Sequence, residues 1–259
     1  MRLDLNAISL KSSTRVCYRN FTVFRKTFFL GFPATLFEPL IYFAVFAIFI
    51  GTRKEGVEGR AYLKFLTPSI IVLSSVFSTT LESTVCVFMR MSLQKLHLSI
   101  ISTPVNSEDV AVGEILWATT KGVIFGTISG TVLAIFGFID SPWALLLPVV
   151  IFLGCSLFAI IGITLTSIVR NFDNFQYYFT LVLTPMVFFS GVFFPSENLP
   201  KIIKILVWFF PLKHFMVVTR ELTLGHISPR LFIEIAWIIV AIFILILLPL
   251  KLLKRRLIN

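Results

Sequence analysis

Charged residues are scarce in this sequence. Only 14% of its 259 residues are charged, whereas 57% are hydrophobic and 29 are phenylalanine. A soluble domain has about 25% charged residues, so this composition excludes an ordinary soluble fold. The net charge of +10 does not indicate a nucleic-acid partner, because the basic residues flank apolar runs and do not alternate with polar residues on a solvated face. The sequence therefore predicts an integral membrane protein.

Residue patterns that carry out chemistry are also missing. The cysteines and histidines are single and far apart, so they indicate neither a disulfide framework nor a metal site (Cys17, Cys86, Cys155; His97, His214, His226). The HExxH and GxSxG motifs are absent, and a phosphate loop is excluded because the sequence contains no Gly-Lys dipeptide. We therefore expect no enzymatic site, cofactor or metal in this chain. Any ATP and Mg²⁺ would be bound by a partner subunit.

Long windows without charge predict an all-α protein with six transmembrane helices, near residues 28–50, 66–88, 113–138, 144–168, 177–194 and 231–250. A β-barrel would need alternating strands of about ten residues. The runs at 141–169 and 174–196 are too long and too uniformly apolar for such strands.

Both chain ends are rich in basic residues. Residues 1–27 mix apolar and basic side chains and lack the apolar core of a cleavable signal, so they predict an amphipathic helix on an anionic membrane surface. Six crossings place both termini on one side. Basic residues next to the first and last spans indicate that this side is the cytoplasm, with residues 251–259 as a basic tail. We predict a multi-pass protein of the cell inner membrane.

A short apolar segment precedes the last span. Residues 199–210 carry Pro200 at their start and are followed by Pro211. Roughly 12 helical residues rise about 18 Å, well short of the roughly 30 Å hydrocarbon core. This segment is predicted to be re-entrant or interfacial, within a hairpin and outer loop over residues 195–230. Irregular backbone at membrane depth is tolerated only around a cavity or pathway, so the hairpin indicates transport.

Among the charged residues inside the predicted spans, where charges need partners, we single out Glu38, Glu82 and Lys121. Glu82 and Lys121 lie at nearly the same depth, so we expect them to pair across two helices. Glu38 has no obvious partner, and substrate contact, structural burial and a dimer contact all stay open. Small residues repeat every fourth position in the third span and favour close helix packing (Gly122, Gly126, Gly130, Ala134).

Several stretches in one order resemble a known family. They are Glu38-Pro39-Leu40-Ile41-Tyr42, the run from Gly113 to Lys121, Thr184-Pro185-Met186, the run from Phe189 to Pro195, Leu199-Pro200, Phe210-Pro211-Leu212 with His214, and Arg220 with Gly225. Together they resemble the ABC-2 type permeases, most closely the nodulation protein J branch, which exports lipo-oligosaccharides. The resemblance covers nearly the whole chain, so we expect one domain over residues 1–259.

This resemblance implies a homodimer with the pathway between its two copies, bound to two copies of a separate ATPase. A short helix between spans two and three would press into the ATPase. Here that loop runs from Arg90 to Asp109, and its expected contact residues are Leu93, Gln94, Lys95, Leu96, His97, Thr103 and Pro104. Lys95 and His97 are expected to face water or the partner. Leu98 stands where relatives commonly have an acidic residue, so we expect a rearranged ATPase contact here.

The fifth span carries the residues expected to gate the pathway. Pro185 removes a backbone donor, so the helix bends easily. The candidate gate residues are Thr184, Pro185, Phe189, Ser190, Gly191, Phe193, Phe194 and Pro195.

The substrate would be an amphipathic lipid or glycolipid. A multidrug or antibiotic efflux permease is the alternative. An ion-coupled secondary transporter would show an internal repeat, which we do not see between the two halves, and a purely anchoring protein would have no use for the hairpin.

Overall fold

The computed structural model describes residues 9–51, 57–193 and 200–258, which are helical with no strand among them. The helices are α1 (Leu10–Gly51), α2 (Val57–Leu81), α3 (Leu96–Ile101), α4 (Ser107–Ile135), α5 (Leu147–Ile168), α6 (Asn174–Tyr177), α7 (Thr184–Phe189), α8 (Lys201–Trp208), α9 (Pro211–Leu224), α10 (Arg230–Leu245) and α11 (Leu247–Ile258). Three π-helical turns are η2 (Glu82–Cys86), η3 (Met89–Leu93) and η5 (Tyr178–Leu183), and η4 (Pro142–Leu146) is a 3₁₀ turn.

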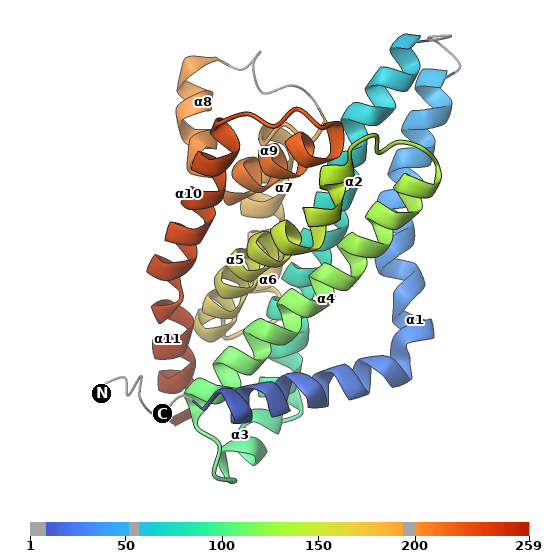
Figure 1. Ribbon diagram of the computed structural model, residues 1–259. Helices are drawn as coiled ribbons and strands as arrows, with labels where there is room; N and C mark the ends of the chain where they lie inside the picture. The colour runs from blue at the N-terminus through green and yellow to red at the C-terminus, as the bar shows by residue number, and fades with distance from the viewer. Residues whose placement is uncertain (1–8, 52–56, 194–199, 259) are drawn as a thin grey trace.

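The helices form an elongated bundle with α2, α4 and α5 at its centre (Figure 1). The first part of α1 lies across the lower end of the bundle in this view, and its second part rises beside α2 and α4. This order is the one expected for a surface segment followed by a span. The start of α1, the short helix α3 and the end of α11 all lie at the same end. That end is called the terminal end below, and the opposite one the distal end.

Four helical stretches in the described residues are long and apolar enough to cross a membrane: Tyr62–Leu93, Ser107–Ile135, Pro142–Ile168 and Arg230–Leu257. They correspond to predicted spans two, three, four and six. The predicted fifth span is shorter than expected, because the continuous helical stretch of α6, η5 and α7 ends at Phe189. Residues 28–50 are helical within α1, but most of their side chains, including that of Glu38, lie outside what the structure describes. The count of six spans stays a prediction.

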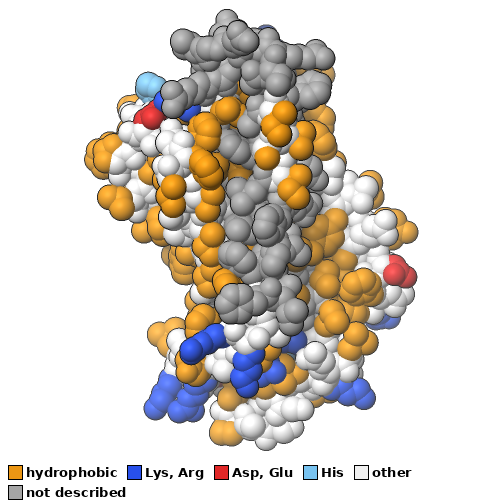
Figure 2. Space-filling view, turned by 90° about the vertical axis from the view of Figure 1, so that its right-hand side faces the viewer, with side chains coloured by type: hydrophobic (Ala, Val, Ile, Leu, Met, Phe, Trp, Pro, Cys, Tyr) orange, Lys and Arg blue, Asp and Glu red, His pale blue; other side chains and the backbone are white. Residues whose placement is uncertain are grey.

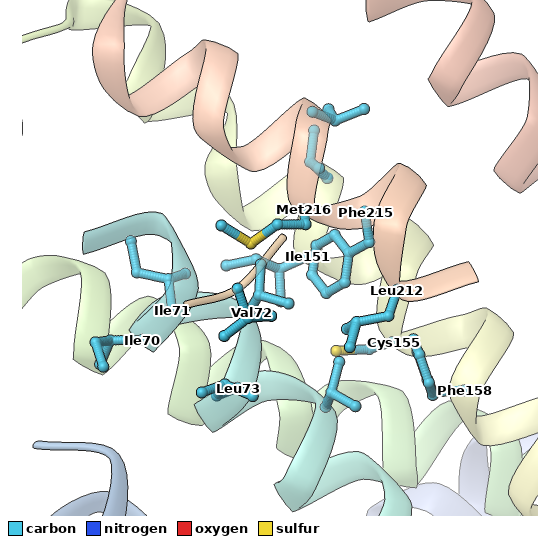
Figure 3. Close-up of a cluster of buried hydrophobic side chains, with 14 of the residues drawn as sticks. Ile70, Ile71, Val72, Leu73, Ile151, Cys155, Phe158, Leu212, Phe215 and Met216 are labelled. Carbon is cyan, nitrogen blue, oxygen red and sulfur yellow. The ribbon is translucent and has the colours of Figure 1, made fainter. Parts of the chain in front are cut away.

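The predicted hairpin region contains two helices that meet at a sharp angle. α8 and α9 are bent by 88° at the break between them, which fits either a broken span or a re-entrant loop. Helix α9 is buried deeply in the bundle. Phe215 packs so closely on α5 that a Cβ atom at Gly154 would lie 2.7 Å from its ring. Figure 3 shows Leu212, Phe215 and Met216 of α9 among core side chains of α2 and α5.

The small-residue stripe of the third span lies where α4 meets its neighbours. A Cβ atom at Gly122 would lie 1.9 Å from Thr79 Oγ1 on α2, and one at Gly126 would lie 2.0 Å from Ser75 Oγ. Both distances are far below van der Waals contact, so only glycine fits. Glycine at these positions therefore sets how closely α2 and α4 approach, as the stripe predicts.

The segment 251–259, predicted as a basic tail, continues the last helix through Ile258. Leu250 and Leu253 are buried against α4 and α5. Lys254 Nζ lies 2.6 Å from Glu108 Oε1, and the Arg256 guanidinium donates to the backbone carbonyls of Thr166 and Val169 at the end of α5. Helix α11 is thus bonded to both α4 and α5.

Candidate functional site

A buried carboxylate of η2 forms the first half of a charge network. Glu82 Oε2 accepts a bond from Lys121 Nζ at 2.7 Å, so the predicted pair is present. Glu82 Oε1 accepts from Arg90 Nη1 at 2.7 Å and from Trp117 Nε1 at 2.8 Å. Glu82 is only 3% exposed. Its two oxygens are therefore satisfied by three donors, two of which lie on α4.

A second buried carboxylate completes the network. Glu114 of α4 is fully buried, and its Oε2 accepts from Arg90 Nη2 at 2.7 Å and from Asn20 Nδ2 at 3.1 Å. Its Oε1 lies 3.0 Å from His97 Nε2. The Arg90 guanidinium therefore bridges Glu82 and Glu114, which is the planar two-sided contact that arginine makes better than lysine. We call Glu82, Arg90, Glu114, Lys121 and His97 the inner network.

Helix geometry explains part of this arrangement. Glu114, Trp117 and Lys121 are spaced by three and four residues, so they share one face of α4. Glu82 is the first residue of η2 and Arg90 lies in η3. The π-helical turn η2 adds a residue to a turn and therefore rotates Arg90 relative to Glu82. Thr84 Oγ1 donates to Thr80 O at 2.5 Å next to η2, so a side chain competes for helix carbonyls there.

The inner network joins segments that are far apart in the sequence. Asn20 belongs to the first part of α1, Arg90 to η3, His97 to α3 and Glu114 to α4. A charge that loses its partner in such an enclosed site costs several kcal/mol. The network therefore favours movement of these segments as a unit.

The loop predicted to contact an ATPase is only partly exposed. Gln94, Lys95, Thr103 and Pro104 are exposed, Leu93 is 69% exposed and Leu96 is half-buried. The expectation that His97 faces water or a partner is wrong, because His97 is fully buried. Lys95 adopts a left-handed conformation with φ of 49°, and from this residue α3 folds back so that His97 meets Glu114.

The far end of this loop is also fixed. Asn106 caps α4, and Asp109 completes the capping box by accepting from the Asn106 backbone N–H at 3.3 Å. Asp109 Oδ1 also accepts from the backbone N–H of Ser9 at 2.7 Å. The start of α4 is thus bonded to the start of α1.

Most of the predicted gate residues lie at the end of α7 and in the segment after it. Phe189 is exposed, Ser190 is buried and Gly191 has a φ of 84°, which glycine adopts without strain. Phe194 and Pro195 lie outside the described residues. Thr184 and Pro185 do not end the helix. Instead, η5 directly precedes them, and this wide turn accommodates the proline.

Three successive carbonyls after α7 are held by side chains of other helices. Gly191 O accepts from Arg220 Nη2 at 2.8 Å, Val192 O accepts from Ser69 Oγ at 2.6 Å, and Phe193 O accepts from Tyr62 OH at 3.4 Å. Ser69 and Tyr62 lie on α2 and Arg220 lies on α9. The segment of the predicted gate is therefore bonded to both helices through its backbone.

A further charge cluster at the distal end was missed by sequence reasoning. Glu234 Oε1 accepts from Lys213 Nζ at 2.9 Å and from Arg230 Nε at 3.0 Å, and its Oε2 contacts His214 Nδ1. His214 stacks on Trp237 with ring centroids 4.0 Å apart. We call Glu234, Lys213, His214 and Arg230 the outer cluster. Glu234 and Glu114 both lie within predicted spans, so their position in the sequence was a usable signal.

Comparisons with known proteins place these features in a family. The family model for the ABC-2 type transporter matches residues 14–224. Nodulation protein J of Rhizobium leguminosarum bv. viciae is 32% identical over 242 residues, which cover 92% of each chain. Nodulation protein J of Sinorhizobium fredii is 30% identical, covering 93% of this chain and 92% of its own. The inner membrane transport permease YadH of Escherichia coli is 25% identical, over 64% of this chain and 66% of its own. The chain therefore belongs to the ABC-2 type transporter family.

Proposed function

We propose that this chain is the permease subunit of an ATP-driven exporter of the cell inner membrane. It works as a homodimer and draws energy from two copies of a separate ATPase subunit. Its substrate is a lipid-linked saccharide or another amphipathic, lipid-like molecule. Family membership and the similarity to nodulation protein J support this assignment, and the absence of a Gly-Lys dipeptide agrees with an energy source outside the chain.

The observation that carries the proposal is the link between an exposed loop and buried charges. Gln94 and Lys95 are exposed at the terminal end. Arg90 and His97, on either side of them, are held by Glu82 and Glu114 between the second and third predicted spans. An ATPase that pushes on the exposed residues would therefore move α2 and α4 with them. This is the mechanical requirement for coupling.

The proposed gate lies at the other end of the same helix α2. Ser69 and Tyr62 hold the carbonyls of Val192 and Phe193. A displacement of α2 would pull on this segment, and the π-helical turn η5 gives the preceding helix a place to bend. Opening would be a two-state change that the ATPase biases when it binds ATP.

Substitution of an exposed loop residue tests the coupling role. Lys95→Glu should lower substrate-stimulated ATP hydrolysis and transport in liposomes that contain the permease and its ATPase, because it reverses a charge at the proposed contact. The amount of permease in the membrane should stay unchanged. Lys201→Glu is the matched control, because it makes the same charge change at an exposed residue of α8, at the distal end.

Equal loss in both variants would indicate a general charge effect and would contradict the docking site. The docking site would also be contradicted if both Lys95→Glu and Gln94→Ala kept full substrate-stimulated ATP hydrolysis and transport. To test the ATPase itself, a Lys95→Cys variant can be cross-linked in native membranes. The proposal requires that the adduct contain a protein with a phosphate loop. If transport continues without nucleotide hydrolysis and follows an ion gradient, the proposal of an ATP-driven exporter is wrong and the protein is a secondary transporter.

A further inference from the structure

A cavity of about 250 Å³ lies between the first part of α1, the π-helical region after α2, and α4. Its lining combines basic, acidic, amide and apolar side chains, including Arg19, Asn20, Phe24, Glu82, Arg90 and Lys121. Arg19 and Val23 in its wall are partly exposed, so the cavity is accessible from outside the protein. The first part of α1 forms one wall and lies across the terminal end of the bundle, at the level expected for a membrane surface (Figure 1).

The charges around this cavity do not cancel. Arg90 and Lys121 are balanced by Glu82 and Glu114 in the inner network. Arg19 Nη1 donates only to the neutral Asn20 Oδ1, at 3.0 Å, and forms no ion pair among the described residues. One positive charge is therefore left over at the cavity.

Two further observations indicate that this cavity favours an anion. Burial lowers the pKa of the Arg19 guanidinium and the nearby charge of Arg90 lowers it further, although Glu114 acts in the opposite direction. Within the described residues, Arg90 Nε is buried and has no hydrogen-bond acceptor. A bound anion would offset the repulsion between the two arginines and would supply the type of acceptor that this donor lacks.

The apolar part of the lining indicates what carries the anion. Val23 is 50% exposed, and Phe24 packs on Trp117 with ring centroids 5.4 Å apart. Basic residues gather at the lower end of the molecule in Figure 2, and hydrophobic side chains cover much of the face above them. A headgroup can therefore reach the cations while its chains lie along apolar surface, as at a membrane interface.

We propose that this cavity is a phosphate-binding site that holds the headgroup of an anionic lipid, with Arg19 as its unpaired cation. The guanidinium suits a phosphate because its fork donates two parallel hydrogen bonds to two oxygens. All residues that line the site belong to one copy of the chain. The bound lipid would hold the first part of α1 against α4 and the inner network.

Native mass spectrometry of the purified protein in neutral detergent tests this site. The probes are dioleoyl phosphatidylglycerol, dioleoylglycerol, which lacks the phosphate, and inorganic phosphate. Phosphatidylglycerol should be retained and dioleoylglycerol should not. Arg19→Gln should weaken phosphatidylglycerol binding about tenfold, which is the loss of one strong charged contact. Arg19→Lys, which keeps the charge and loses the fork, should give an intermediate result.

Arg25→Gln is the matched control, because Arg25 is an exposed basic residue of the same helix and does not line the cavity. General attraction of basic residues to anionic lipid would weaken binding equally in both variants and would overturn the proposal. Unchanged binding in Arg19→Gln would also overturn it. Inorganic phosphate that competes at an equal concentration would support the phosphate chemistry and assign the occupant to a free anion, whereas its failure to compete assigns the lipid. None of these results depends on the ATPase or on transport.

Discussion

The inner network and the outer cluster are both built on buried carboxylates, but they connect different things. The inner network joins α3, α4 and the π-helical turns η2 and η3, and Asn20 adds α1. The outer cluster joins α9 and α10, and the contact of His214 Nε2 with Trp208 O at 2.7 Å adds α8; these three helices follow one another in the chain. The inner network can therefore transmit a displacement between distant segments, whereas the outer cluster fixes the local angles between successive helices.

The two regions also differ in charge balance. The carboxylates of Glu82 and Glu114 match the cations of Arg90 and Lys121, all of which are largely enclosed. In the outer cluster, the single carboxylate of Glu234 serves both Lys213 and Arg230, and the Arg230 side chain is 63% exposed. Water can stabilise the excess charge there. An enclosed network has to balance its own charges, because unpaired charge away from water is costly.

The largest expected effect comes from removing the carboxylate that has no solvent access. Glu114→Ala leaves Arg90 with one partner and His97 with none at Nε2, so we expect a loss of stability of about 3–5 kcal/mol. Glu234→Ala should cost less, because Arg230 can be hydrated. The apparent unfolding temperatures of the two purified variants in detergent give this comparison. A larger decrease for Glu234→Ala would show that connectivity and enclosure do not decide which carboxylate matters more.

An exchange of charges within the inner network should give only partial recovery. Glu82→Lys and Lys121→Glu should each destabilise the protein. The double variant restores that one pair, but Glu82 also accepts from Arg90 and Trp117, and a lysine at this position would face Arg90. We expect the double variant to fall between the worse single variant and the unchanged protein in unfolding temperature and in transport. Complete recovery would mean that the pair acts alone and that Arg90 is not part of a network.

Glycine substitutions on α4 compare the packing near the inner network with the packing nearer the distal end, and their expected effect on stability is smaller. Gly122→Ala should destabilise the protein by about 1–3 kcal/mol, because its new Cβ would lie 1.9 Å from Thr79 Oγ1. Gly130→Ala, two helical turns nearer the distal end, should be tolerated, because its nearest neighbour would be Ile71 Cδ1 at 3.5 Å. Thermal unfolding of the two variants measures the difference. Equal tolerance at both positions would mean that α2 and α4 can separate without cost at the inner network.

Sequence reasoning identified what depends on composition and regular spacing. Charge-free windows predict α4, α5 and the last span because lipid forces the chain to be apolar over the full length of a crossing. The pairing of Glu82 with Lys121 was predictable from depth, since both lie on long helices of known rise per residue. The glycine stripe on α4 predicted its close packing for the same reason.

Contacts that depend on irregular backbone were not predictable. Arg90 reaches both carboxylates because the π-helical turn η2 changes the rotation of the chain between Glu82 and η3, and no spacing rule for a regular helix contains that shift. His97 is buried because the chain folds back at Lys95, which adopts a conformation uncommon for a non-glycine residue.

The sequence by itself thus determined that the chain is helical and membrane-embedded, that it contains no phosphate loop, and that charged residues lie within its predicted spans. The tertiary structure alone decided which charges meet and that α2 and α9 hold the carbonyls of Gly191, Val192 and Phe193. It also decided that Arg19 pairs with no carboxylate in the part of the chain that the structure describes. The physical reason is that amino-acid composition and hydrophobic periodicity can be read directly along the sequence. Partners of buried polar groups are instead fixed by how distant segments approach one another, and this depends on every turn between them.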